Sequence, residues 1–195
     1  SFQLAEEFCG NIDVPVWGVT GLEADDLIAQ ALLKYSDHYK KIYVLSNDDD
    51  LNQFLDLQNL ILLRKNKEYN WENFNQDYPS ITPKDWVMLT AMTGTHNAVK
   101  GIDRIGIKTA LKIMNDVVKL ESTYQQHKEL LELNYSLIQL PYPKFNWKTV
   151  VMPELSSPKI SEMKLMRYIE RYGIRYSTVM MEAFSKYSIR NKLYV

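Results

Sequence analysis

Acidic side chains gather at two places in the sequence, and their types and spacing suit a divalent cation. One place is the stretch GLEADD and the other is the stretch SNDDD, and each follows an apolar run. Carboxylates this close repel one another unless solvent, a helix N-terminus or a cation compensates their charge. Oxygen ligands of this kind are the ones that Mg²⁺ and Mn²⁺ prefer. The acidic residues are Glu23, Asp25 and Asp26 in the first stretch and Asp48, Asp49 and Asp50 in the second.

A metal ion held by carboxylates suits phosphodiester hydrolysis, because the ion activates water and neutralises charge on a phosphate oxygen. The chain has no glycine-rich phosphate loop and no G-x-S-x-G nucleophile elbow. The simpler interpretation is that EADD is an ordinary helix start, where the helix dipole favours acids, and that SNDDD is a cap and a turn. Metal-assisted hydrolysis is the leading prediction if the two stretches meet in space.

The elements predicted around the two stretches form a β-α-β pattern that brings them together. VPVWGV (14–19) and KIYVLS (41–46) are expected to be strands, and the apolar spacing predicts a helix over 25–35 between them. A right-handed crossover places the carboxyl ends of two parallel strands at the same edge of a sheet. Since one acidic stretch follows each strand, we expect both at that edge.

The rest of the chain continues this layout and then becomes helical. Thr82 has the features of an N-cap, a proline follows it, and Gly94 suits the end of that helix. The other elements expected are a helix over 2–9, a short helix over 50–55, a strand over 60–63, and helices at about 107–115, 124–140, 159–172 and 176–187. We therefore predict an α/β fold with a mostly parallel sheet over 1–80, followed by a helical part over 81–195.

Composition narrows the class of protein. With 23 basic and 24 acidic residues, the net charge of −1 does not indicate a nucleic-acid binder, so such a role depends on local charge. The single cysteine and the three scattered histidines argue against an internal disulfide and against zinc. No apolar run approaches the roughly 18 residues of a membrane span, and the start lacks a secretion signal. We expect a cytoplasmic protein with no membrane partner.

A glycine turn with positive charge is the second informative feature. In KGIDRIGIKTALK, two glycines flank an apolar turn, and a helix then opens whose free amides can meet a phosphate. Such contacts bind the DNA backbone without reading its sequence. The alternative is a turn that only joins two packed helices. The predicted DNA-binding residues are Lys100, Gly101, Arg104, Ile105, Gly106, Lys108 and Thr109.

Together the three stretches resemble the 5′-nuclease family, which comprises flap endonucleases, phage 5′ to 3′ exonucleases and the 5′-nuclease domains of bacterial DNA polymerases. GLEADDLIA is similar to the family's G-x-E-A-D-D helix start, and SNDDDLNQFL to its S-x-D-x-D-x-x-Q-L strand end. GIDRIGIKTA is similar to the glycine turn of its helix-three-turn-helix. The resemblance covers about residues 10–115, with the motifs in the family's order.

This resemblance implies a PIN-like α/β fold with a helix-three-turn-helix subdomain, in a protein of a bacterial or phage-infected cell. It implies Mg²⁺ or Mn²⁺ as cofactor. The metal ligands and catalytic residues that it implies are Glu23, Asp25, Asp26, Asp48 and Asp50, with Asp49 at the variable position between the last two. It also implies that the glycine turn holds duplex DNA by one strand, often with a potassium ion bound to backbone carbonyls. The expected substrate is DNA with a 5′ flap or a 5′ end.

The sequence departs from the family pattern at two places. The acidic pairs that hold the family's second metal correspond to GTHNAVKG, where Asn97 and either Gly94 or Thr95 stand in place of aspartates. This implies a degenerate second metal site. The family's opening strand, with an essential aspartate, and its basic arch have no counterpart before SFQLAEEF. The fold is therefore expected to be incomplete at its N-terminus, with a separate N-terminal fragment as a partner.

The sequence is compatible with three functions. The first is a metal-dependent, structure-specific 5′ nuclease, of which this chain is the C-terminal portion. The second is a catalytically impaired relic or subunit that recognises branched or duplex DNA, and Asn97 favours it. A weaker third possibility is an RNase of the related fold, against which the glycine turn argues.

Overall fold

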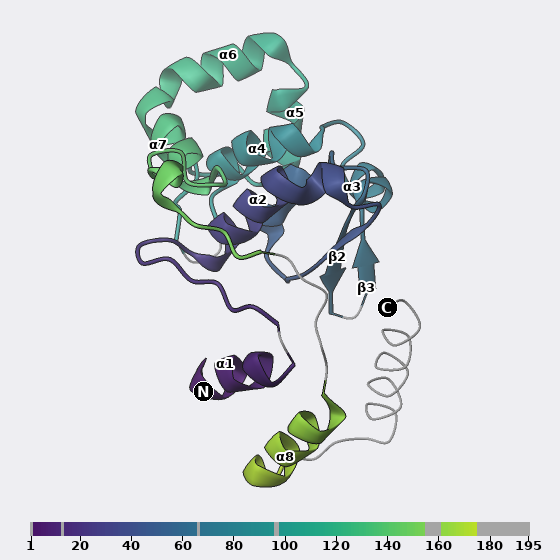
Figure 1. Ribbon diagram of the computed structural model, residues 1–195. Coiled ribbons are helices and arrows are strands. Elements are labelled where there is room, and N and C mark those ends of the chain that lie inside the picture. Colours follow the sequence, from purple (N-terminus) through teal and green to yellow (C-terminus); the bar gives the residue numbers. More distant parts are fainter. Residues whose placement is uncertain (1, 13, 66, 96–97, 155–160, 175–195) are drawn as a thin grey trace. The chain divides into compact units, whose positions relative to one another are not determined.

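The computed structural model spans residues 1–195 and describes all of them except 1, 13, 66, 96–97, 155–160 and 175–195 (Figure 1). The chain forms two compact units. Residues 1–18 and 151–195 make up one, called the terminal unit here, and residues 19–150 make up the central unit. Within the described ranges, no helix has the length and apolar character needed to cross a bilayer.

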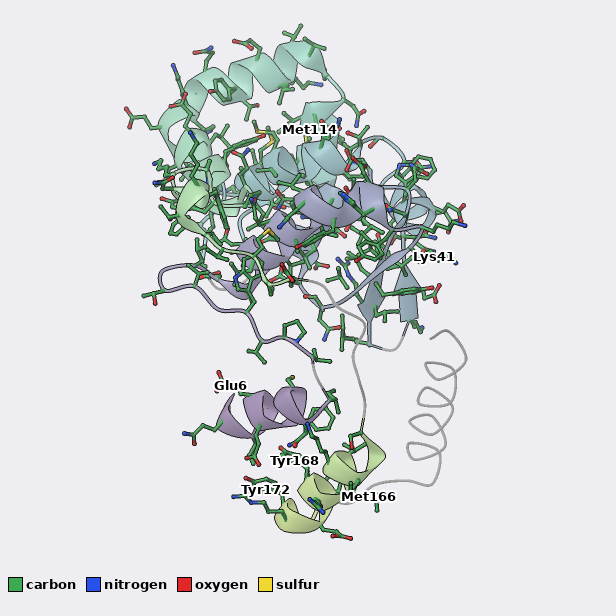
Figure 2. All side chains as sticks on the ribbon, viewed as in Figure 1. Glu6, Lys41, Met114, Met166, Tyr168 and Tyr172 are labelled. Carbon is green, nitrogen blue, oxygen red and sulfur yellow. The ribbon has the colours of Figure 1, made fainter. Side chains whose placement is uncertain are left out.

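In the terminal unit, helix α1 (Phe2–Asn11) packs against helix α8 (Glu162–Tyr172) through aromatic side chains. The hydroxyl of Tyr168 donates a hydrogen bond of 2.6 Å to the carbonyl of Leu4, and its ring lies 5.6 Å from that of Phe8. Figure 2 shows Tyr168 and Tyr172 between these two helices. The helix expected over 159–172 corresponds to α8, whereas the one expected over 176–187 lies outside the described residues.

The central unit contains a three-stranded mixed sheet in the order β1-β2-β3. Strand β1 (Ile42–Leu45) is parallel to β2 (Leu60–Arg64), with Ile42 opposite Leu60, and β3 (Lys67–Tyr69) is antiparallel to β2. The predicted α/β class is confirmed, as are the strands expected over 41–46 and 60–63. The sheet is mixed, because the short strand β3 turns back beside β2.

The strand expected over 14–19 is wrong, because these residues form no ladder with another strand. Pro15 has no backbone N–H to donate to a neighbouring strand, which disfavours a place inside a sheet. Val16 is 54% exposed, so the apolar run VPVW is not a buried core strand either. The acidic stretch GLEADD is therefore positioned by the helix that follows it and not by a preceding strand.

That helix, α2 (Ala24–Tyr35), begins where the sequence predicts. Glu23 is its N-cap, and the side chains of Glu23 and Asp26 form a capping box with each other's backbone amides. A 3₁₀ helix, η2 (Asp49–Phe54), follows β1 in place of the short helix expected over 50–55. Helix α3 (Trp71–Asp77), with Asn70 as N-cap, was not predicted.

The helical part follows the predicted order with different boundaries. Thr82 donates to Asp85 at the start of η3 (Pro83–Asp85), and helix α4 (Trp86–Thr93) ends at Gly94. Beyond it come α5 (Ile107–Met114), α6 (Val117–Gln126) and α7 (Lys128–Ile138), which Figure 1 shows gathered away from β2 and β3. The single helix expected over 124–140 is wrong. His127, with φ −122°, separates α6 from α7, and α6 begins earlier than predicted.

One hydrophobic core holds the central unit together. It joins the sheet to the helices through fully or nearly fully buried side chains such as Leu62, Phe74, Met92, Ala110 and Leu131. Residue 80, where the sequence predicts the change from α/β to helical structure, lies inside this unit, and side chains from both sides share its core. The division of roles between 1–80 and 81–195 stays a prediction.

Candidate functional site

The acidic residues of both motifs line one pocket of about 620 Å³ in the central unit. The start of α2 contributes one group of them and the segment between β1 and η2 contributes the other. The carboxylates that line this acidic pocket are Glu23, Asp25, Asp26, Asp48 and Asp50. The structure thus brings together every residue predicted as a metal ligand, although the path of the chain before Glu23 differs from the predicted one.

The carboxylates share the pocket without forming a ready-made ligand set. Among the described residues, no three Asp, Glu, His or Cys side chains are arranged as a group that could hold a metal ion. Like charges that line a shared space repel one another, which disfavours their close approach. Binding of a cation would therefore require these side chains to move inward.

The pKa values of two carboxyl groups reflect their burial and, to a smaller extent, the neighbouring carboxylates. Burial raises the pKa of Asp50 to about 6, and the charges of Asp48 and Asp25 add to the effect. Burial also raises the pKa of Asp25; the backbone amide of Asp26 opposes this shift, and Glu23 adds to it. A divalent cation in the pocket would favour the ionised forms, because it supplies the opposite charge that these groups need.

Asp26 differs from the other acids because the fold already uses both of its oxygens. It is only 6% exposed. Its Oδ1 accepts a hydrogen bond of 2.7 Å from the amide of Tyr142, and its Oδ2 accepts one of 3.3 Å from the amide of Glu23. Asp25 is half-buried, and its Oδ1 accepts from the amide of Asp26 at 3.0 Å.

Arg64 fixes the conformation of the second acidic stretch. From the end of β2, its Nη1 donates to Oδ1 of Asp49 at 2.9 Å, and its Nη2 donates to the carbonyl of Asp48 at 3.1 Å. Asp48 itself caps η2, since its Oδ1 accepts from the amide of Asp50 at 2.9 Å. Asp49 is thus paired with Arg64, while Asp48 and Asp50 line the acidic pocket.

This role of Arg64 was not predicted from the sequence. A signal was present: Arg64 ends β2, which runs parallel to β1 with Leu45 opposite Leu63. Residues just beyond the ends of paired parallel strands are neighbours. The residue after Leu63 can therefore reach the turn that follows Leu45.

The predicted second metal site lies beside the first. A second pocket of about 470 Å³ is lined by Asp48 and Asp50, by Gly94 and Thr95, and by Ile107 at the start of α5. Thr95 lines the acidic pocket as well. Asn97 lies outside the described residues. The described positions of this predicted site therefore adjoin the carboxylates but add no charge of their own.

The glycine turn is built by close contact between two backbone segments. Gly94, with φ +76°, pairs with Lys100 in an antiparallel bridge, and the amide of Ile102 donates to the carbonyl of Met92 at 2.8 Å. A Cβ on Gly101 would lie 2.2 Å from the carbonyl carbon of Thr93, so only glycine fits there. This contact fixes the turn to the end of α4.

The turn presents its predicted DNA-binding side chains to solvent. Arg104, Lys108 and Thr109 are exposed, and Lys100 lies 3.5 Å from Asp103 in a pair so exposed that it adds little stability. Gly106 is the N-cap of α5 and has no side chain to occupy the amides of the first turn. This surface offers positive charge and backbone N–H groups together, as a phosphate requires.

Asn134 ties this turn to the helices behind it. It lies on α7, is only 3% exposed, and its Nδ2 donates to two carbonyls at 2.9 Å, those of Ala91 and Lys100. One buried amide therefore joins α7, α4 and the start of the turn. Sequence reasoning had no signal for it, because its partners lie far from it along the chain.

Curated proteins and a family model resemble parts of this chain. A family model described as "5'-3' exonuclease, N-terminal resolvase-like domain" matches residues 1–79. A 5′-3′ exonuclease of Buchnera aphidicola subsp. Schizaphis graminum is 27% identical over 136 residues, which cover 69% of this chain and 46% of the relative. One from Mycoplasmopsis pulmonis is 33% identical over 127 residues, covering 63% and 42%. The chain thus spans less than half the length of these relatives.

Solved structures share the fold. The bacteriophage T5 5′-exonuclease, in a mutant form, superposes with a TM-score of 0.58 at 20% identity, covering 66% of this chain and 59% of the other. A bacteriophage T5 flap endonuclease in complex with DNA and metal ions gives a TM-score of 0.60 at 17% identity, covering 97% and 64%. The family model, the curated relatives and the shared fold agree with the resemblance of the three motifs to the 5′-nuclease family.

Proposed function

We propose that this chain is the C-terminal portion of a metal-dependent, structure-specific 5′ nuclease that hydrolyses DNA phosphodiesters at 5′ flaps or 5′ ends. The observation that carries the proposal is the acidic pocket, where carboxylates from two separate motifs line one space of about 620 Å³. The proposed place of action is the cytoplasm of a bacterial or phage-infected cell.

Mg²⁺ or Mn²⁺ is the proposed cofactor, and the residues present fit it. All the candidate ligands are carboxylates. Burial, together with the neighbouring carboxylates, raises the pKa of Asp25 and Asp50, and a cation would favour their ionised forms. Asp48, Asp50 and Asp25 are the proposed ligands, with Glu23 beside them. When bound, such an ion supplies an activated water and neutralises charge on the phosphate. Since Gly94 and Thr95 are neutral, we expect only one well-formed site.

The proposed role of the glycine turn is to hold the duplex by its backbone beside the acidic pocket. Ile107, at the start of helix α5, lines the second pocket together with Asp48 and Asp50. This supports a route by which the DNA strand bound at the glycine turn reaches the carboxylates. By resemblance to the family, a potassium ion bound by backbone carbonyls of the turn belongs to the same proposal.

An N-terminal fragment is the proposed protein partner. The relatives are more than twice as long as the matched region, and β1 is an edge strand among the described strands of the central unit. Tyr43 and Leu45 on the outer face of β1 are 50% and 79% exposed. An unpaired edge with apolar side chains beside it suits the addition of another strand.

A flap-cleavage assay in Mg²⁺ tests the proposed function. Residues 1–195 alone should cleave a 5′-flap substrate at least about 100-fold more slowly than they do together with a fragment that carries the aspartate-bearing strand and basic arch implied by the family resemblance. The reason is that single electrostatic contributors commonly supply 10²–10³-fold. The reconstituted pair should lose cleavage when Asp48 is replaced by alanine. Full activity of residues 1–195 alone would make the fragment dispensable. An inactive pair that still binds DNA would favour the catalytically impaired DNA-binding relic.

The double substitution Arg104→Ala with Lys108→Ala should weaken binding of unrelated DNA sequences about equally. Each side chain is exposed beside the free amides of α5, so each can neutralise one phosphate and release a counterion. We expect the slope of log affinity against log salt to fall by up to about two units. Fluorescence anisotropy at several salt concentrations measures it.

The control for this pair is Lys119→Ala with Lys128→Ala, which removes the same charge from α6 and α7. These lysines already pair with Asp116 and Glu132. They should change the slope far less. Equal losses in both double variants would show that net charge, and not the glycine turn, governs DNA binding.

A further inference from the structure

The segment that follows α7 forms part of the acidic pocket. Ile138, Leu140 and Tyr142 line the pocket together with the carboxylates of the two acidic motifs. We call Ile138–Tyr142 the wall segment. It lies far from both motifs along the chain, and nothing in the motifs indicates it.

The wall segment and the residue after it have few backbone N–H donors, because two of residues 140–143 are prolines. Pro141 and Pro143 have no N–H, so Leu140 and Tyr142 carry the only backbone N–H groups of residues 140–143. Both groups are bound by side chains of the acidic motifs. The amide of Leu140 donates to Oε1 of Gln53 at 2.9 Å, and that of Tyr142 donates to Oδ1 of Asp26 at 2.7 Å.

Gln53 joins the wall segment to the loop that carries Asp50. Its Nε2 donates to the carbonyl of Asp50 at 2.7 Å and to that of Ile138 at 3.3 Å. With the bond from Leu140, one amide side chain satisfies three backbone groups on two separate segments. Because its donors and its acceptor are all used, its geometry fixes the distance between the wall segment and the metal loop.

Asp26 supplies the second attachment. Both of its oxygens accept backbone hydrogen bonds, from Tyr142 and from Glu23, and it is almost fully buried. A carboxylate held in this way could not move inward toward a metal ion without releasing Tyr142. Asp25, its neighbour, is not bound to the wall segment by any described hydrogen bond.

We infer that Asp26 and Gln53 are positioning residues. They hold the wall segment against the acidic pocket, where its partly exposed residues Leu140 and Tyr142 pack on the sugar and base of the nucleotide whose phosphate the carboxylate-bound metal would receive. This inference rests on the proposed function. Apolar surface beside a few polar groups is how proteins orient a ligand of mixed character. Asp26 then acts through Tyr142 and not as a metal ligand.

The first test compares Asp26→Asn with Asp26→Ala. Both remove the same charge, but asparagine keeps an oxygen for the amide of Tyr142. Hydrogen exchange at that amide should be about tenfold faster in Asp26→Ala and nearly unchanged in Asp26→Asn, since one hydrogen bond contributes about that factor. Binding of 5′-flap DNA in Ca²⁺ should weaken about tenfold in the alanine variant only.

Asp25 is the matched control. Asp25→Asn and Asp25→Ala should leave exchange at Tyr142 unchanged and should lower Mn²⁺ affinity to a similar extent. If Asp26→Asn lowers Mn²⁺ affinity as strongly as Asp25→Asn does, Asp26 is a ligand and the inference is overturned. Hydrogen exchange and Mn²⁺ titration need no turnover, so a failure of the proposed nuclease activity would be seen separately.

The second test is a double-mutant cycle with Gln53→Ala, which removes no charge. If Asp26 and Gln53 act through the same wall segment, losing both should weaken DNA binding in Ca²⁺ little more than losing one. Losses that multiply would show that the two residues act independently and would overturn the shared role.

Discussion

Replacing Asp48 with alanine is expected to lower the affinity for Mn²⁺ by at least about 100-fold, since even residues that only support a metal ligand commonly contribute 10–100-fold. Asp48 lines both pockets, and it also caps η2 by accepting from the amide of Asp50. The substitution removes a proposed ligand and frees the backbone of a second one. Isothermal titration calorimetry of the metal-free protein measures the change.

Asp49→Ala is the matched control, because it removes an equal charge from the adjacent position. Asp49 is bound to Arg64 at 2.9 Å, and Arg64 would still hold the carbonyl of Asp48. We expect Mn²⁺ affinity within about fivefold of that of the unmodified protein, as for an exposed charge that acts only through solvent. Equal losses in the two variants would refute Asp48 as a ligand and leave only general electrostatics.

Replacing Gly101 with alanine should have the largest effect on stability. The new Cβ would lie 2.2 Å from the carbonyl carbon of Thr93 and 2.5 Å from the amide nitrogen of Gly94, and both are backbone atoms that cannot rotate away. Overpacking of this kind costs about 3 kcal/mol or more when the backbone must shift. Thermal unfolding should show a midpoint lower by roughly 10 °C for a unit of this size.

The Gly101→Ala variant should also bind DNA more weakly, because the glycine turn would separate from α4. Gly106→Ala is the control: nothing lies within 4 Å of a Cβ there, and its φ is −93°. That variant should stay within about 0.5 kcal/mol of the unmodified protein, as surface substitutions do. A Gly101→Ala variant as stable as Gly106→Ala would mean that the two backbone segments are not in contact.

Local sequence signals predicted the elements whose ends are specified by nearby residues. Helix α2 begins at its capping box, and the η3–α4 segment begins at Thr82 and ends at Gly94, because those caps use side chains within a few positions. Strand β3 escaped prediction because only its pairing with β2 makes it a strand. The prediction of a strand over 14–19 was wrong because it rested on the apolar pattern and did not take Pro15 into account.

The candidate site, too, could be predicted from the sequence only in part. The types and order of the acidic residues predicted that they lie in one place, and they do, although the strand expected before Glu23 does not form. The contacts of Arg64 with Asp48, and of Asp26 with Tyr142, were not predictable, because they join residues that only the folded chain brings together. Motifs therefore indicated which residues carry the chemistry but not which residues hold them in place.

The hydrogen bonds of Asn134 make the glycine turn a part of the cooperative core of the central unit. Because this amide is buried and bonds to the carbonyls of both Ala91 and Lys100, the turn cannot open locally without exposing polar groups on α7 and α4. Its opening free energy is therefore tied to that of the helices, unlike that of a typical surface loop. A DNA-binding surface anchored in this way keeps its shape between binding events, so little ordering entropy is lost when DNA arrives.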